Sequence, residues 1–160
     1  MGLARTRTVV LVGVEGHVVE VEADITPGLP ATVIVGLPDA AVGESRDRVR
    51  AAVLNSALPW PKTRITVGLS PASLPKRGSS LDLAIAAGVL AAEAVVPLES
   101  LEGVALVGEL ALDGRVRPVP GVLVAAIAAR RAGASTLVVP DAHADEAALV
   151  PGLHVVAVTC

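Results

Sequence analysis

The 160-residue chain is long enough for one domain with a sizeable core, and its composition of 52% apolar and 18% charged residues excludes a disordered chain. A single cysteine, Cys160, excludes an internal disulfide, and a single aromatic residue, Trp60, argues against an RRM-type surface that stacks nucleic-acid bases. The net charge is −3, but residues 1–80 hold nine basic against seven acidic residues, so a basic surface is expected only from this half.

The N-terminal third of the chain is predicted to be β-rich. Two runs, 8–14 and 17–25, predict strands joined by a hairpin turn at Gly16. The second run alternates, which places Val19, Val21 and Ala23 on its buried face. A third strand is predicted at 32–35.

A helix is predicted at 40–56, where apolar residues recur at helical spacing. Its other face carries charged residues, namely Glu44, Arg46, Asp47, Arg48 and Arg50. Arg46 and Arg50 share one side of this helix, and Glu44 is placed to pair with Arg48. The pattern is typical of a solvated helix face, and contact with nucleic acid is the alternative.

The remaining elements follow from the same signals. In chain order they are a strand at 64–69, a buried helix at 79–94, a strand at 104–112 that turns at Asp113-Gly114 into 115–118, a helix at 121–132 stopped by Gly133, a strand at 136–139, a helix at 142–149 and a strand at 154–158. No linker-like segment interrupts them, so residues 1–160 are predicted to form one α/β domain.

Several common sites are missing from the sequence. Lys62-Thr63 ends like a phosphate-binding loop, but Pro61 stands where that loop needs glycine, so no ATP binding is expected of this chain. His143, Asp145 and Glu146 do not converge on a short helix, so no metal site is expected. The longest stretches without charge or proline are about half of the ~20 residues that span a bilayer, which favours a cytoplasmic protein without membrane contact.

The most specific stretch is 74–82, where Lys76 and Arg77 precede the predicted start of a helix at Ser79. Free backbone N–H groups and two cations favour an anion at such a place. Ser79 and Asp82 also fit a capping box, in which they simply satisfy the end of the helix. The residues alone favour capping, and phosphate binding or a nucleophilic serine are the alternatives.

Several motifs together resemble the N-terminal domain of the ComM/YifB family, which are AAA+ ATPases similar to Mg-chelatase subunit I. The motifs cover nearly the whole chain and are V-G-L-P-D-A-A-V at 35–42, E-S-R at 44–46, R-V-R-A-A at 48–52, R-I-T-V at 64–67, L-P-K at 74–76, G-S at 78–79, D-L at 82–83, G-E-L at 108–110, L-D-G at 112–114 and R-P-V at 117–119. The sequence departs from the family pattern at Gly68, Ser73 and Leu81, where Asn, Asp and Phe are expected.

The resemblance implies a fold similar to ribosomal protein S5 domain 2 and to Lon protease, with a β-β-β-α-β-α core, a further hairpin, additional helices and strands, and a left-handed crossover. It also implies an AAA+ motor beyond residue 160 that uses ATP and Mg²⁺, assembles as a homo-hexamer and drives branch migration of DNA during natural transformation. This chain would then be the Lon-like N-terminal module, with no cofactor and no enzymatic activity of its own.

The likeness to Lon also places Ser80 at the position of the catalytic serine. The position that corresponds to its lysine partner holds Leu123, and no lysine follows Lys76 in the chain. Because a serine without a base is a weak nucleophile, peptidase activity is not expected.

The sequence is therefore compatible with three functions. The first is a non-catalytic module that contacts single-stranded or branched DNA or assembles the ring, with candidate contacts at Lys76, Arg77, Ser79, Arg46 and Arg50. The second is a Lon-like serine peptidase at Ser80, and the third is a motor component for metal insertion of the Mg-chelatase type.

Overall fold

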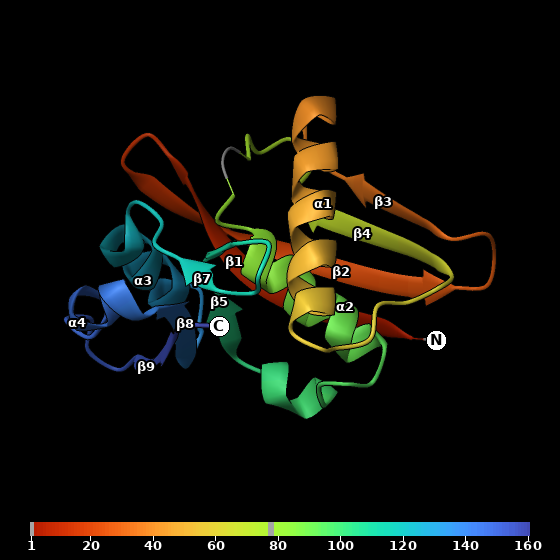
Figure 1. The fold of residues 1–160 in the computed structure, drawn as a ribbon. Helices are drawn as coiled ribbons and strands as arrows, with labels where there is room; N and C mark the ends of the chain where they lie inside the picture. The colour runs from red at the N-terminus through yellow and green to blue at the C-terminus, as the bar shows by residue number, and fades with distance from the viewer. Residues whose placement is uncertain (1, 77–78) are drawn as a thin grey trace.

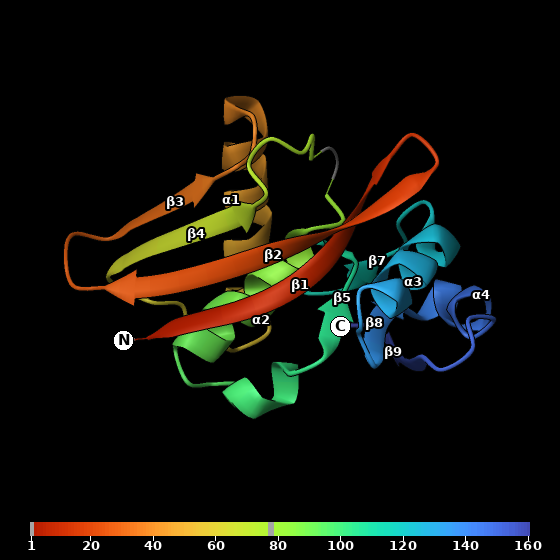
Figure 2. The same ribbon diagram turned by 180° about the vertical axis from the view of Figure 1, so that it is seen from behind.

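The computed structural model describes residues 2–76 and 79–160, which fold around a seven-stranded sheet of order β3-β4-β2-β1-β5-β8-β9 (Figures 1 and 2). The pairs β1–β2 and β2–β4 are antiparallel, whereas β3–β4, β1–β5, β5–β8 and β8–β9 are parallel. A mixed α/β domain with a mostly parallel sheet is thus confirmed, and so is the predicted β-β-β-α-β-α order of its first six elements.

The long hairpin of β1 (Leu3–Val12) and β2 (Glu15–Thr26) forms the centre of the sheet. The alternation predicted for β2 is confirmed, since Val19, Val21 and Ala23 are all fully buried. The predicted turn at Gly16 is wrong. Gly16 pairs with Leu11 inside the hairpin, and the turn falls at residues 13–14. Gly13 supplies the positive φ of 63° that a tight turn requires.

A crossover helix connects two parallel strands at one side of the sheet. The chain passes from β3 (Ala31–Val35) through α1 (Asp39–Asn55) to β4 (Arg64–Ser70). Figure 1 shows α1 in front of the sheet, with β3 and β4 running the same way, and the direction of the step makes the crossover left-handed. This is the handedness that the resemblance implied.

Two hydrophobic clusters fill the interior. One lies under α1 and α2 (Asp82–Ala92), and the other lies under α3 (Val122–Arg131). Val10 and Leu106 belong to the first cluster, whereas their neighbours Val9 and Ala105 belong to the second. Since successive strand residues point to opposite faces, the two clusters cover opposite faces of the central strands.

The second half of the chain differs from expectation around residue 108. The strand predicted at 104–112 is split into β5 (Val104–Leu106), which joins the main sheet, and β6 (Glu109–Leu110), which pairs with β7 (Val116–Arg117) as a separate hairpin. The chain leaves the sheet at Gly108, where an added Cβ would lie 2.7 Å from the Val116 side chain. The predicted turn at Asp113-Gly114 is confirmed as the tip of this hairpin.

The last elements follow the prediction, except that the helix predicted at 142–149 is found as a 3-10 helix at Asp141–His143 and a short α-helix at Ala144–Ala147. Helix α3 ends at Arg131 and is followed by Gly133, whose φ is 92°; the amides of Gly133 and Ala134 donate to the carbonyls of Arg130 and Ala129, as in a Schellman motif. The remaining elements are η1 (Leu98–Leu101), β8 (Thr136–Pro140), η2 (Asp141–His143), α4 (Ala144–Ala147) and β9 (His154–Val158). Within the described ranges, no helix is both long and apolar enough to cross a bilayer.

Candidate functional site

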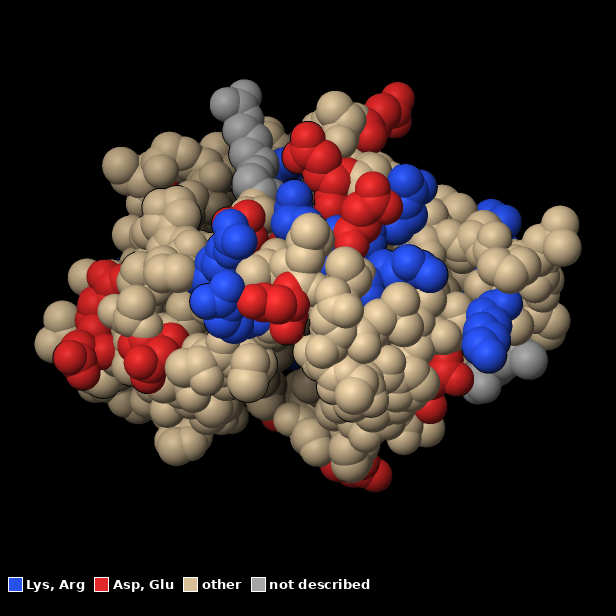
Figure 3. Space-filling view, in the orientation of Figure 1, with Lys and Arg blue, Asp and Glu red and all other residues tan. Residues whose placement is uncertain are grey.

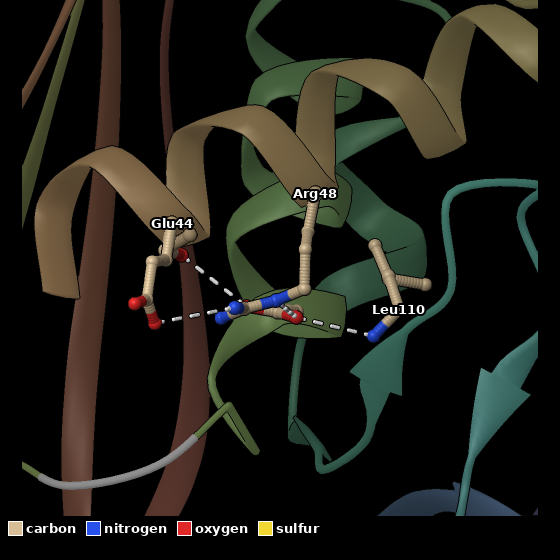
Figure 4. Close-up of polar contacts among 5 residues, drawn as sticks. Glu44, Arg48 and Leu110 are labelled. Carbon is tan, nitrogen blue, oxygen red and sulfur yellow. Dashed lines mark hydrogen bonds and ion pairs between the residues drawn. The ribbon is translucent and has the colours of Figure 1, made fainter.

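A buried carboxylate joins the segment 74–82 to the crossover helix. Asp82 is the first residue of α2, and none of its surface is exposed. Arg48 of α1 donates to this carboxylate twice, from Nε to Oδ2 at 2.7 Å and from Nη2 to Oδ1 at 3.2 Å. Ser45 Oγ donates to Oδ1 at 3.2 Å, and the Leu110 amide donates to Oδ2 at 3.1 Å (Figure 4). One side chain therefore holds α1, α2 and β6 together.

Burial and hydrogen bonding act in opposite directions on the pKa of Asp82. Burial raises the pKa of the Asp82 carboxyl, while the hydrogen bonds from Arg48, Leu110 and Ser45 act to lower it. The hydrogen bond to Asp82 raises the pKa of Arg48, whose side chain keeps 23% of its surface exposed. The predicted pair of Arg48 with Glu44 is present at 3.9 Å, but it is the longer of the two ion pairs of Arg48.

The capping box predicted for Ser79 and Asp82 is wrong. Helix α2 begins at Asp82, its N-cap residue is Leu81, and no side chain caps it. Ser79 accepts a hydrogen bond from the Asp82 amide through its backbone carbonyl instead. The Asp82 carboxylate instead accepts hydrogen bonds from Arg48 of α1 and Leu110 of β6, which lie 34 and 28 residues away in the sequence. Because these partners are distant in sequence, a local motif could not reveal them.

Lys76 is not the open loop cation that the sequence predicts. The residue is only 3% exposed, and its Nζ donates to the carbonyls of Pro71 at 2.6 Å and Leu74 at 3.0 Å. Burial lowers the pKa of this ammonium group. Lys76 thus ties its own loop together, and its predicted partner Arg77 lies outside the described residues.

Ser80, at the Lon-like serine position, is half-buried and lies two residues before α2. Its backbone carbonyl accepts a hydrogen bond from the Gly108 amide at 3.1 Å, which fixes the segment against the β5–β6 connection. Its hydroxyl has no hydrogen bond with a described His, Lys, Asp or Glu side chain. Leu123 lies elsewhere, in an apolar groove of α3 with Ile127 and Leu149.

The two candidate arginines of α1 lie on its exposed side. Arg46 is paired with its neighbour Asp47 at 3.4 Å, whereas Arg50 borders a groove that it shares with Lys62. Neither Lys76 nor Ser79, both described by the structure, is among the residues that line this groove, so the structure does not bring them together with Arg50. Figure 3 shows cations and acids interleaved over this face.

His143 has a structural role in the described part of the chain. Its Nε2 accepts a hydrogen bond from the Val119 amide at 3.1 Å, and its Nδ1 lies 2.7 Å from Oε1 of Glu146. Both ring nitrogens are therefore occupied by protein groups. Among the described residues, the Asp141 side chain forms no cap hydrogen bond at η2 or α4.

Comparison with known proteins gives a family match. Residues 21–143 match the model of subunit ChlI of Mg-chelatase. The chain is 56% identical over 155 residues to an uncharacterized protein of Mycobacterium tuberculosis, and this match covers 97% of the chain and 31% of that protein.

Two further relatives carry the names that the motifs suggested. The chain is 42% identical over 152 residues to YifB of Escherichia coli, which covers 95% of the chain and 30% of YifB. It is 41% identical over 150 residues to the competence protein ComM of Haemophilus influenzae, which covers 94% of the chain and 29% of ComM. The chain thus spans about a third of the length of these relatives.

A more distant likeness concerns the fold. Lon protease 2 of Thermus thermophilus is 27% identical over 145 residues, which covers 86% of the chain and 18% of that protease. Together with the left-handed crossover, this likeness agrees with a fold of the ribosomal protein S5 domain 2 type.

Proposed function

Because the chain belongs to the family of the Mg-chelatase subunit ChlI, we propose that it is the non-catalytic, Lon-like module of a Mg-chelatase-like AAA+ ATPase. In this proposal the ATP- and Mg²⁺-binding motor lies outside residues 1–160, and the complete protein works as a homo-hexamer on branched DNA. The resemblance to the competence protein ComM supports a DNA substrate over metal insertion.

The absence of catalysis is proposed from the contacts that the side chains of the segment 74–82 make. Peptide hydrolysis by a Lon-like serine requires a base within hydrogen-bond reach of the hydroxyl. The two ionisable side chains described in this segment are both used for structure, Lys76 by two carbonyls and Asp82 by Arg48. The segment therefore serves to hold α1, α2 and β6 in one rigid body.

We assign the DNA contact to the exposed side of α1. Arg46 and Arg50 project from the helix that the Asp82 cluster fixes, so their positions are held relative to the sheet. Contacts between such cations and phosphates do not depend on base sequence. Lys76 is not assigned a DNA contact, because its ammonium group is buried.

Ring assembly is the second candidate function, and one observation favours it. A groove on α3 is lined by Leu123, Ile127 and Leu149 together with Arg130 and Arg131, and Leu149 is 71% exposed. Apolar surface of this kind is typical of contacts between proteins.

The test of the DNA contact is fluorescence anisotropy of labelled single-stranded and branched DNA with the 160-residue chain across a salt series. The proposal predicts weak, sequence-independent binding, with a Kd on the order of 10⁻⁴–10⁻⁶ M at physiological salt, that tightens as salt falls. Absence of binding at low salt would contradict a DNA contact and leave assembly as the function of this module.

A further inference from the structure

A groove of about 480 Å³ separates the C-terminal half of α1 from the start of β3. Arg50 and Leu54 form its helix side, and Pro30 and Thr32 form its strand side. The segment from Trp60 to Thr63, which connects α1 to β4, forms its end. Three separate segments of the chain thus line this groove.

The charge of this groove is positive. Arg50 and Lys62 both line it and are both exposed. Neither forms an ion pair or a side-chain hydrogen bond with any described residue, in contrast to Arg46, Arg48 and Arg115, which all have acidic partners. The lining contains no acidic residue. An anion placed here would meet two cations without displacing an internal partner.

The groove also holds the only aromatic side chain of the protein. Trp60 is half-buried, with part of its surface packed against the core under α1 and another part lining the groove. No hydrogen bond to a described residue is formed by its indole N–H. An aromatic side chain beside two cations is a combination found where proteins bind single-stranded nucleic acid, in which a base stacks and the neighbouring phosphates are neutralised.

We propose that this groove binds single-stranded DNA, with one base on Trp60 and the adjoining phosphates at Arg50 and Lys62. The inference rests on the proposed function, because it names the place and the strand form of the DNA contact on α1. Since every base has a π-face, the groove would accept all four bases.

The protein carries its own probe for this site. Trp60 is the single tryptophan of a chain without tyrosine, so the intrinsic fluorescence reports on the groove alone. We expect quenching when the wild-type chain is titrated with oligo(dT), because stacking changes the surroundings of the indole. Titration with dTMP at the same nucleotide concentration should give much less quenching, since a mononucleotide lacks the adjoining phosphates.

Charge reversal tests the two cations. Arg50→Glu and Lys62→Glu should each weaken the binding of oligo(dT) roughly tenfold, and each should flatten the slope of log K against log salt by about 0.7. Arg130→Glu and Arg131→Glu on α3 are the matched controls and should change Kd less than about twofold. Trp60→Leu should weaken the binding measured by anisotropy by about five- to a hundredfold.

The outcomes separate this inference from the proposed function. DNA binding seen by anisotropy without a change in Trp60 fluorescence would overturn the groove and keep the proposed function. Equal quenching by dTMP and oligo(dT) would overturn a strand site, and so would an unchanged Kd in both Arg50→Glu and Lys62→Glu. Absence of DNA binding in both assays at low salt would overturn both the groove and the DNA contact of the proposed function.

Discussion

The Nε atom of Arg48 donates a 2.7 Å hydrogen bond to the carboxylate of Asp82, a residue 34 positions later in the chain. This contact fixes the crossover helix to the start of the next helix, and the Leu110 amide adds the β6–β7 hairpin to the same carboxylate. Removing one partner of a buried charge pair is costly, because the other charge stays buried without compensation.

We therefore expect Arg48→Met to lower the free energy of unfolding by about 3 kcal/mol, at the low end for a buried pair because the Arg48 side chain remains 23% exposed. Glu44→Gln is the matched control on the same helix and should cost less than about 0.5 kcal/mol, since Glu44 is 75% exposed. Urea denaturation measures both. Similar losses in the two variants would mean that Asp82 is not the main partner of Arg48.

The start of α2 gives a second stability prediction. Because neither serine side chain caps the helix, Ser79→Ala and Ser80→Ala should each change the free energy of unfolding by less than about 0.5 kcal/mol. A true N-cap serine would cost about 1 kcal/mol on the same substitution. A loss of that size at Ser79 in thermal or urea unfolding would restore the capping box that the sequence suggested.

Two glycines, Gly36 after β3 and Gly68 within β4, should respond differently to the same substitution. Gly36 has a φ of 105°, and an added Cβ would lie 2.7 Å from the Leu69 carbonyl oxygen, so Gly36→Ala should cost about 1–3 kcal/mol. Gly68 has open space around its Cβ position, so Gly68→Ala should be neutral or stabilising by up to about 1 kcal/mol. Parallel melting curves of the two variants decide this, and a stable Gly36→Ala protein would contradict the backbone geometry at Gly36.

Most of the fold could be predicted from the sequence because its signals are local. Alternation identified β2, and Gly133 marked the end of α3 through its positive φ. The site could not be predicted in the same way. Arg48 is placed on a solvated face by helical spacing, and only the tertiary contact with Asp82 turns it inward. The burial of Lys76 could not be predicted either, because no local pattern shows that a loop will bury its ammonium group.

Peptidase chemistry is expected to be absent. A serine-reactive fluorophosphonate should leave Ser80 unlabelled under conditions that label a Lon protease, because no described base is within hydrogen-bond reach of its hydroxyl. Mass spectrometry of the intact chain measures the label. Stoichiometric modification that disappears in Ser80→Ala would show that another group activates this serine.

Paired charge reversals test most directly whether α1 presents its exposed cations to DNA. Arg46→Glu/Arg50→Glu and Arg115→Glu/Arg117→Glu change the net charge equally, but the second pair lies on the β6–β7 hairpin, where Arg115 is paired with Asp113. Anisotropy across a salt series should show a Kd for single-stranded DNA weakened at least tenfold in the α1 pair, with a slope flattened by about 1.4, and little change in the hairpin pair. Equal weakening in both pairs, or none in the α1 pair, would contradict the account.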